Sequence, residues 1–404
     1  MNRWITIILL GGLALLGGVA GLWLYDEPLE PQTQAWLDQL AEPEAKSAAY
    51  LQLLGLDAPA GSDPLVEGRK RLSAANIDAE ASGLAIPGDE ICSLTESGCL
   101  QRLLQDREAR AAHLHQHREL LQRYEELLTL EDYRTLSKVS MSEPMPAYGA
   151  LIKANQLRAL QALGLIDEKR GAEALQLLEQ DIRQLRALLV DADSLIMKMA
   201  LVNLLARDLD NLALLYHAEL LPRPAIQPAL SAAERDMLAA MRREFALVAH
   251  GLEGVAGDAN MASMGFARWQ LQLLYKPRMT INDSLSTYLR IAENARLDAQ
   301  SFARQVRDGK SETAERPAPW RRLLNPVGMI LGEVAVPDFN RYLARLHDLD
   351  AKIVLFNQLG REAQAGGNPY RPDQGPEWNA EVQRLCFDGP LPDHQLLRCL
   401  PGEA

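Results

Sequence analysis

Three histidines stand at alternate positions of one charged, helix-forming stretch, at His113, His115 and His117. Because residues four apart share a helix face, His113 and His117 place two imidazole rings together and are the candidate metal ligands. A metalloprotease motif needs a glutamate beside the first histidine and a third ligand, whereas this stretch reads His-Leu-His-Gln-His. We therefore favour a solvated, pH-sensitive helix face, and we expect neither a metal nor a cofactor.

Asp208, His347 and Asp350 are the candidate residues for acid–base catalysis. Asp208 falls in register with four leucines of the segment 201–215, so we expect a partly buried carboxylate with a cationic partner such as Lys198 or an Arg from another helix. His347 and Asp350 belong to an Arg-Leu-His-Asp-Leu-Asp stretch that we expect on the outer face of a helix. Because structural ion pairs displace pKa values as catalytic sites do, the structural interpretation is favoured for these residues.

Sequence motifs of nucleophilic and nucleotide-dependent enzymes do not occur in this chain. Ser263 has a glycine two residues later but none two residues earlier, so it does not complete Gly-x-Ser-x-Gly, and no Ser-x-x-Lys motif is present. A phosphate-binding glycine loop and a dinucleotide fingerprint are also missing from the sequence. These observations favour a protein without enzymatic activity, although a site assembled from distant helices would leave no local signature.

The four cysteines form two local pairs, Cys92 with Cys99 and Cys386 with Cys399. Three connectivities are possible, and pairing of neighbours would close short loops that each stabilise the fold by roughly 2.5 to 3 kcal/mol. Two disulfides fit an oxidising compartment. A four-thiolate metal site is the alternative, but the six and twelve intervening residues do not match the close spacing of zinc ribbons or fingers.

The segment 254–280 interrupts the helical pattern with glycine, methionine and alanine. Its large apolar residues include Met261, Met264, Phe266 and Trp269, which we consider a possible wall of a pocket for a lipid or fatty acid. Packing in an ordinary core explains the same residues equally well.

Composition predicts an all-α protein that does not bind nucleic acid. The chain has 404 residues, of which 48% are hydrophobic and 5% aromatic, a mixture that favours helices over sandwiches or barrels. Its formal net charge of −12 argues against binding to nucleic acid, which depends on Lys and Arg neutralising phosphates. Apolar periodicity predicts helices over 99–128, 148–164, 172–189, 193–221, 231–251, 282–307, 325–336 and 338–365. Ser231 and Glu234 have the pattern of a capping box, and Asn282 and Asn325 stand where an N-cap is favoured.

These helices predict a multi-helix bundle over residues 34–365. The pair 148–164 and 172–189 has the length of a tetratricopeptide unit, but the consensus Trp, Gly and Tyr positions are absent. A short array of helical hairpins remains the alternative. Residues 366–404 form a Gly- and Pro-rich tail, in which two short apolar stretches predict a disulfide-clipped β-hairpin.

Residues 1–25 predict one N-terminal transmembrane helix. Residues 4–25 carry no charge, include eleven Leu, Ile or Val residues, and are bracketed by Trp4 at one end and Trp23 with Tyr25 at the other. A cleaved secretory signal is the alternative, since small residues at 18–21 allow cleavage. Arg3 before the segment and the acidic linker 26–33 after it place the N-terminus in the cytoplasm and the main domain outside.

The sequence therefore predicts a single-pass inner-membrane protein of the bacterial envelope, with a periplasmic helical domain that binds, scaffolds or chaperones another envelope protein. Its layout resembles that of the lipase-specific foldases, which also have one anchor and a helical body. The Arg-x-x-Phe-Asp-Tyr motif of that family is absent, and the nearest stretch, 384–388, is followed by Gly389. An envelope hydrolase and a lipid-binding protein are the alternatives.

Overall fold

The computed structural model describes residues 21, 23–40, 46–73, 83–88, 91–255, 273–309, 318–335, 338–360 and 367–402. These residues confirm the mostly helical fold with a small antiparallel sheet near the C-terminus. Most of the predicted transmembrane segment and the predicted pocket wall at Met261, Met264, Phe266 and Trp269 lie outside the described residues. Within the described ranges, no helix combines the length and apolarity that crossing a bilayer requires.

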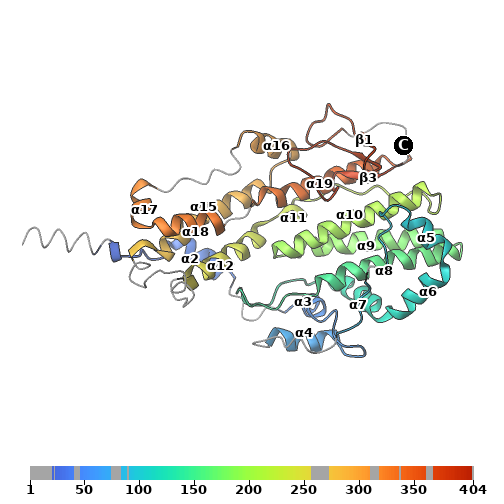
Figure 1. Ribbon diagram of the computed structural model, residues 1–404, viewed down its shortest axis with the longest axis horizontal. Helices are drawn as coiled ribbons and strands as arrows, with labels where there is room; N and C mark the ends of the chain where they lie inside the picture. Colours follow the sequence, from blue (N-terminus) through green and yellow to red (C-terminus); the bar gives the residue numbers. More distant parts are fainter. Residues whose placement is uncertain are drawn as a thin grey trace, which may run out of the picture.

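The body is elongated and is built around α10 (Leu195–His217), which packs against α8 (Tyr148–Asp167), α9 (Gly171–Asp191) and α19 (Asn340–Asn357) (Figure 1). Helix α10 is buried over most of its circumference, as its leucine-rich sequence requires of a helix that is apolar on all sides. It begins where Ser194 accepts a hydrogen bond from the Met197 amide, a favoured N-cap arrangement. The main core therefore surrounds this helix.

The predicted long helix 99–128 is three helices in the structure. They are α5 (Cys99–Gln105), α6 (Arg107–Gln116) and α7 (Arg118–Leu128). Asp106 causes the first break, since its side chain accepts a hydrogen bond from the Ala109 amide and starts a new helix. The second break falls at His117, which ends α6.

Further helices flank the central bundle. Helices α3 (Ala48–Leu54) and α4 (Pro64–Ser73) cross so closely that a Cβ at Gly68 would lie 2.0 Å from the Leu51 carbonyl oxygen. Glycine at this position permits the crossing. Helix α11 (Ala232–Arg235) begins with the predicted capping box of Ser231 and Glu234 and leads into α12 (Leu238–Val255).

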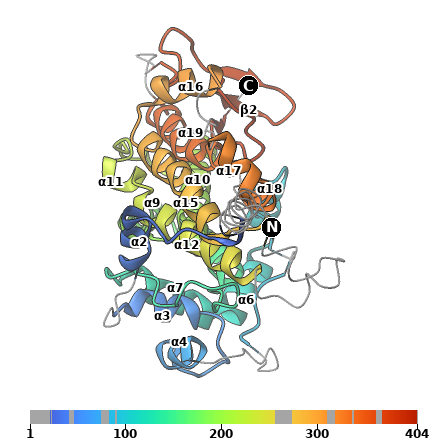
Figure 2. The same cartoon turned by 90° about the vertical axis from the view of Figure 1, so that its left-hand side faces the viewer.

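One end of the molecule gathers α2, α12, α15, α17 and α18, as the end-on view in Figure 2 shows. Their bounds are Pro31–Asp38 for α2, Pro277–Asn294 for α15, Pro319–Leu324 for α17 and Pro326–Ala335 for α18. A chain of aromatic contacts crosses this end, with ring centroids 6.0 Å apart for Trp36 and Phe245 and 5.4 Å apart for Phe245 and Tyr288. These contacts join α2, α12 and α15, which are distant in sequence.

The C-terminal tail forms three antiparallel strands, β1 (Glu377–Asn379), β2 (Arg384–Cys386) and β3 (Cys399–Pro401). The predicted hairpin corresponds to β2 and β3, in which Cys386 is the register partner of Cys399. Both predicted disulfides, Cys92–Cys99 and Cys386–Cys399, are present, so the four-thiolate metal site is excluded.

Buried charges attach this sheet to the helices. Asp210 of α10 accepts hydrogen bonds from Lys352 of α19 and, at 2.8 Å, from Arg384 of β2. Asp348 of α19 accepts from Arg398 at 3.0 Å. The sheet and α16 (Ala299–Arg307) cover a face of α19 that the sequence analysis placed outside.

Candidate functional site

Asp208, the first candidate acid or base, is enclosed at the centre of the bundle with 1% of its surface exposed. Its Oδ1 accepts a hydrogen bond from Asn155 at 2.9 Å, and Asp181 of α9 is ion-paired to Arg158 beside it. Burial raises the pKa of Asp208 well above its ordinary value, and the negative charge of Asp181 raises it further. The predicted burial is confirmed and is nearly complete. Lys198 is not the partner, because its ammonium donates to the Leu189 carbonyl, whereas Arg158 of α8 is the nearby Arg from another helix.

His347 and Asp350 are also buried, so their predicted position on an outer helix face is wrong. The His347 ring stacks on Phe302 of α16 with centroids 4.8 Å apart, and burial lowers its pKa to about 4. The Asp350 carboxylate accepts from the Leu230 amide at 2.6 Å and from Arg235 at 2.9 Å. Among the described residues, no hydrogen bond or ion pair joins any two of the three candidates. His347 and Asp350 have neighbours that explain their burial, whereas the second carboxylate oxygen of Asp208 is buried without a hydrogen-bond partner.

The two candidate metal ligands are separated by the end of α6. His117 is buried with 3% exposure, and its Nδ1 lies 3.0 Å from the Ala85 carbonyl oxygen, while His113 remains on α6 and is partly exposed. The predicted solvated face is therefore wrong for His117. In the part of the chain that the structure describes, no group of three or more potential ligands could hold a metal ion.

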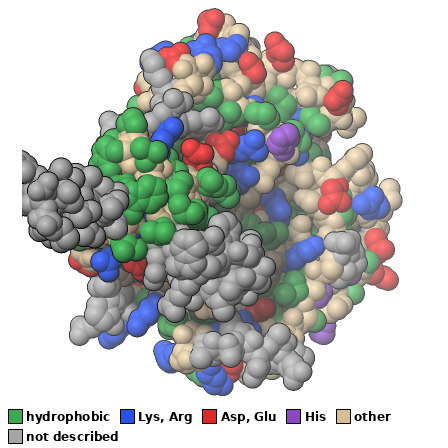
Figure 3. Space-filling view, turned by 60° about the vertical axis from the view of Figure 1, so that its left-hand side comes forward, with side chains coloured by type: hydrophobic (Ala, Val, Ile, Leu, Met, Phe, Trp, Pro, Cys, Tyr) green, Lys and Arg blue, Asp and Glu red, His purple; other side chains and the backbone are tan. Residues whose placement is uncertain are grey.

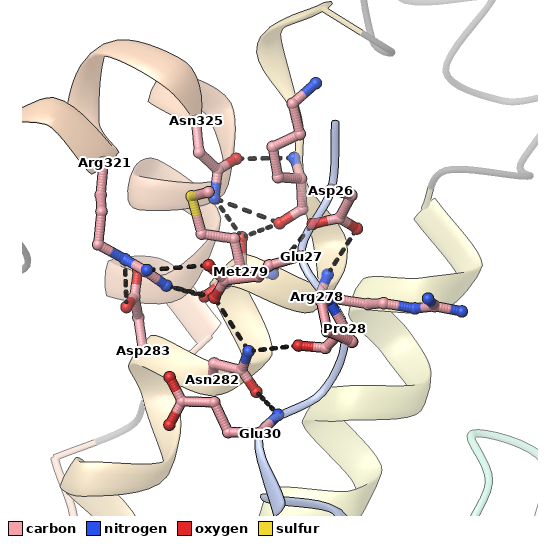
Figure 4. Close-up of polar contacts among 12 residues, drawn as sticks. Asp26, Glu27, Pro28, Glu30, Arg278, Met279, Asn282, Asp283, Arg321 and Asn325 are labelled. Carbon is pink, nitrogen blue, oxygen red and sulfur yellow. Dashed lines mark hydrogen bonds and ion pairs between the residues drawn. The ribbon is translucent and has the colours of Figure 1, made fainter. Parts of the chain in front are cut away.

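A different set of polar residues joins the start of the described chain to α15 (Figure 4). Asp26 lies at the N-terminus of this helix, where its carboxylate accepts hydrogen bonds from the amides of Arg278 at 3.1 Å and Met279 at 3.2 Å. The first turn of a helix leaves these amides unpaired, and a negative charge there is favourable. Asp26 thus caps a helix that begins about 250 residues later in the sequence.

Glu27 continues this attachment through Arg321 of α17. The guanidinium donates to both carboxylate oxygens of Glu27, at 2.6 and 3.0 Å, and also pairs with Asp283 of α15 at 2.9 Å. Burial alone would raise the pKa of Glu27, but hydrogen bonds from Arg321 and Asn282 outweigh it and lower the pKa. At Asp283 burial outweighs the same guanidinium and the pKa is raised.

Asn282 completes the attachment from the next turn of α15. Its amide donates to Glu27 at 2.9 Å and to the Pro28 carbonyl at 3.1 Å, while its oxygen accepts from the Glu30 amide at 3.0 Å. The prediction of Asn282 as a helix N-cap is wrong, because Asp26 allows α15 to begin five residues earlier, at Pro277. We refer to these contacts of residues 26–30 with α15 and α17 as the linker contact.

Helix α18 is attached to the same end of α15 through Asn325, which was predicted correctly as its N-cap. The Asn325 side chain donates to the Thr280 hydroxyl at 2.8 Å and accepts from the amides of Lys276 at 2.8 Å and Gly328 at 3.1 Å. A Cβ at Gly328 would lie 2.1 Å from the Thr280 hydroxyl oxygen, so only glycine permits this approach. Gly332, one turn further along, faces the same threonine.

The opposite side of α17 and α18 is apolar and exposed. We call Trp320, Leu323, Ile330 and Val334 the apolar end face, with exposed fractions of 52%, 70%, 63% and 79%. Hydrophobic side chains gather at this end of the molecule in Figure 3. Tyr25, at the end of the predicted membrane segment, is 58% exposed. Such a surface on a protein is typical of a site that contacts a partner or a membrane.

Sequence reasoning missed both the linker contact and the apolar end face. It treated residues 26–33 as a connection only, because no local signal indicates that an acidic residue caps a distant helix. A signal for α18 was present in its composition, since Glu333 is the one charged residue between Pro326 and Ala335.

No protein-family model, curated protein or solved structure matches this chain.

Proposed function

We propose that this protein is a membrane-anchored helical binding or scaffold protein of the bacterial envelope, chaperone-like in action, with its body on the periplasmic side. Residues 4–25 serve as the anchor. The single observation that carries the proposal is the linker contact, in which Asp26 and Glu27 attach the chain to α15 and α17 directly after the apolar segment. A body attached in this way keeps one orientation relative to the membrane, as a scaffold requires.

Two further observations support the proposal. The disulfides Cys92–Cys99 and Cys386–Cys399 suit an oxidising compartment such as the periplasm. Asp208, His347 and Asp350 are each buried away from solvent, where a substrate would not reach them, which favours binding over hydrolysis. The body would therefore present its helical surface to another envelope protein.

The test uses the full-length protein expressed in a bacterial host with its own N-terminus. Membranes are washed with alkaline carbonate, and the intact mass of the purified chain is measured. The proposal expects the protein to stay in the membrane pellet with residues 1–25 intact. A soluble protein that has lost its first twenty or so residues would show a cleaved signal and refute the anchor.

A second measurement addresses the partner. Crosslinking of intact cells, followed by purification in detergent and mass spectrometry, is expected to recover one envelope protein in stoichiometric amount. The matched control is the Glu27→Gln, Asp26→Asn double variant, which keeps the anchor but weakens the linker contact and should recover less partner. Recovery of the chain alone from both forms would contradict the scaffold function.

A further inference from the structure

We propose that the apolar end face of α17 and α18 inserts into the interfacial layer of the bilayer that holds the anchor, as a second membrane contact of the body. The inference rests on the proposed function, because it takes residues 4–25 as the anchor. It adds a specific surface and a specific ligand, the headgroup and upper acyl-chain region of a lipid leaflet.

The first argument is the orientation of α18. In water, a helix packed on a protein body normally buries its large apolar residues and exposes its polar ones. Here the glycines Gly328 and Gly332 face α15, while Ile330 and Val334 point outward with 63% and 79% exposure. The close approach at Gly328 maintains this orientation, because a rotated helix would bring a larger side chain against Thr280.

The second argument is the position of this surface. Arg321 of α17 holds Glu27, so α17 lies beside the second residue after Tyr25. Two residues of extended chain span about 7 Å, so the end of the predicted anchor lies within about 7 Å of the linker contact. Figure 3 shows the hydrophobic side chains at this end of the molecule. The apolar end face and the anchor therefore meet the membrane at the same level.

The third argument is the kind of residue at the edge of the face. Trp320 lies against the Arg321 guanidinium, whose carbon is 5.3 Å from the ring centroid, and tryptophan and arginine both favour the headgroup layer. Arg278 and Arg322 are exposed nearby, but Glu30 and Glu333 are exposed as well. Because these charges offset one another, we expect insertion to occur in neutral phosphatidylcholine without anionic lipid.

The experiment places one fluorescent probe on the apolar end face of the full-length protein. All four native cysteines are in disulfides, so a cysteine introduced by Val334→Cys is the one reactive thiol. It is labelled with an environment-sensitive nitrobenzoxadiazole dye, and the protein is reconstituted into phosphatidylcholine vesicles. We expect emission at shorter wavelength than from the same dye on a side chain that stays in water, and loss of intensity when the lipid carries a nitroxide near its headgroup.

The matched control is Ile226→Cys, which is also exposed, at 58%. Helix α19 starts beside Tyr288 of α15 and ends at Asn357, about 27 Å further along its axis. Gln227, the neighbour of Ile226, is hydrogen-bonded to Asn357 at that far end. A label there should remain in water and should not respond to the nitroxide lipid. This control separates insertion of one face from general adsorption of the protein.

Vesicle flotation separates failure of the inference from failure of the anchor. If the protein floats but the Val334→Cys label stays in water, the second contact is refuted and the anchor stands. If the label is shielded from water yet insensitive to the nitroxide lipid, then protein covers the face, through a second copy or a partner, and the inference is refuted. A protein that does not float refutes the anchor and the inference together.

Discussion

Replacement of Gly328 by alanine tests the packing that turns the apolar side of α18 outward. The new methyl group would lie 2.1 Å from the Thr280 hydroxyl oxygen and 2.3 Å from the Asn325 amide nitrogen, far inside contact distance. Neither side chain can move freely, because Asn325 is bonded to Thr280, to Lys276 and to the Gly328 amide. We therefore expect the helix to shift and these bonds to break.

The magnitude follows from the bonds that are lost. Three hydrogen bonds at about 1 kcal/mol each give a cost of about 3 kcal/mol, and the better helix propensity of alanine returns about 1 kcal/mol. The net loss is about 2 kcal/mol in the attachment of α18. This corresponds to a rise of roughly 30-fold in the population of the detached helix.

Gly332→Ala is the matched control on the same helix. A Cβ there would lie 3.6 Å from the Thr280 methyl carbon, which is ordinary contact, so this variant should gain up to about 1 kcal/mol. Hydrogen exchange measured by mass spectrometry on the detergent-solubilised chain compares the amides of α18 in both variants. Equal protection in Gly328→Ala and Gly332→Ala would refute the reasoning that close approach at Gly328 orients the helix.

Three further predictions concern buried charges. Burial raises the pKa of Glu244 to about 7, so the free energy of unfolding falls as pH rises from about 4.5. Glu244→Gln should therefore raise the free energy of unfolding by about 2 to 3 kcal/mol at pH 8 and leave it unchanged at pH 4. Burial lowers the pKa of His347 to about 4, so the free energy of unfolding falls as pH drops below 6.5. In urea unfolding, His347→Phe should remove about 3 kcal/mol of this loss of stability in acid. Asp210→Asn leaves the buried cations Lys352 and Arg384 without their anion and should cost about 3 to 5 kcal/mol, with faster tryptic release of the C-terminal sheet.

Exposed residues of the same type serve as controls for these three changes. Glu253→Gln on α12, His115→Phe on α6 and Asp373→Asn in the tail each alter a side chain at the surface and should leave stability within about 0.5 kcal/mol. A shift that does not depend on pH would contradict the titration argument for either buried group. An unchanged C-terminal sheet in the Asp210 variant would contradict the role of the Asp210 ion pairs in attaching the sheet to the helices.

The linker contact also bears on how the two ends of the chain are assembled. Asp26 and Glu27 pair with residues near 278 and 321, so the N-terminal linker reaches its place when α15 and α17 are present. These contacts therefore form only after the chain as far as Arg321 is present. The same contacts lie next to the proposed lipid surface.

The sequence by itself determined the helical class, the helices of the central bundle, the disulfide pairs and the C-terminal hairpin. These features depend on local information, since apolar periodicity, N-caps such as Ser231 and Asn325, and short cysteine loops are all read within a few residues. It failed at the break at Asp106, where a capping side chain overrides an otherwise continuous apolar pattern.

Only the tertiary structure decided which charged residues are buried and which apolar residues are exposed. His347 and Asp350 lie inside because α16 and the segment before α11 pack over α19. The sequence of α19 itself gives no sign of these neighbours. Helix α15 begins at Pro277 because Asp26, about 250 residues earlier, caps it. The apolar side of α18 faces outward because glycine permits the closest approach to α15 on the other side. Each of these outcomes depends on contacts between distant segments, which the chain acquires when it folds.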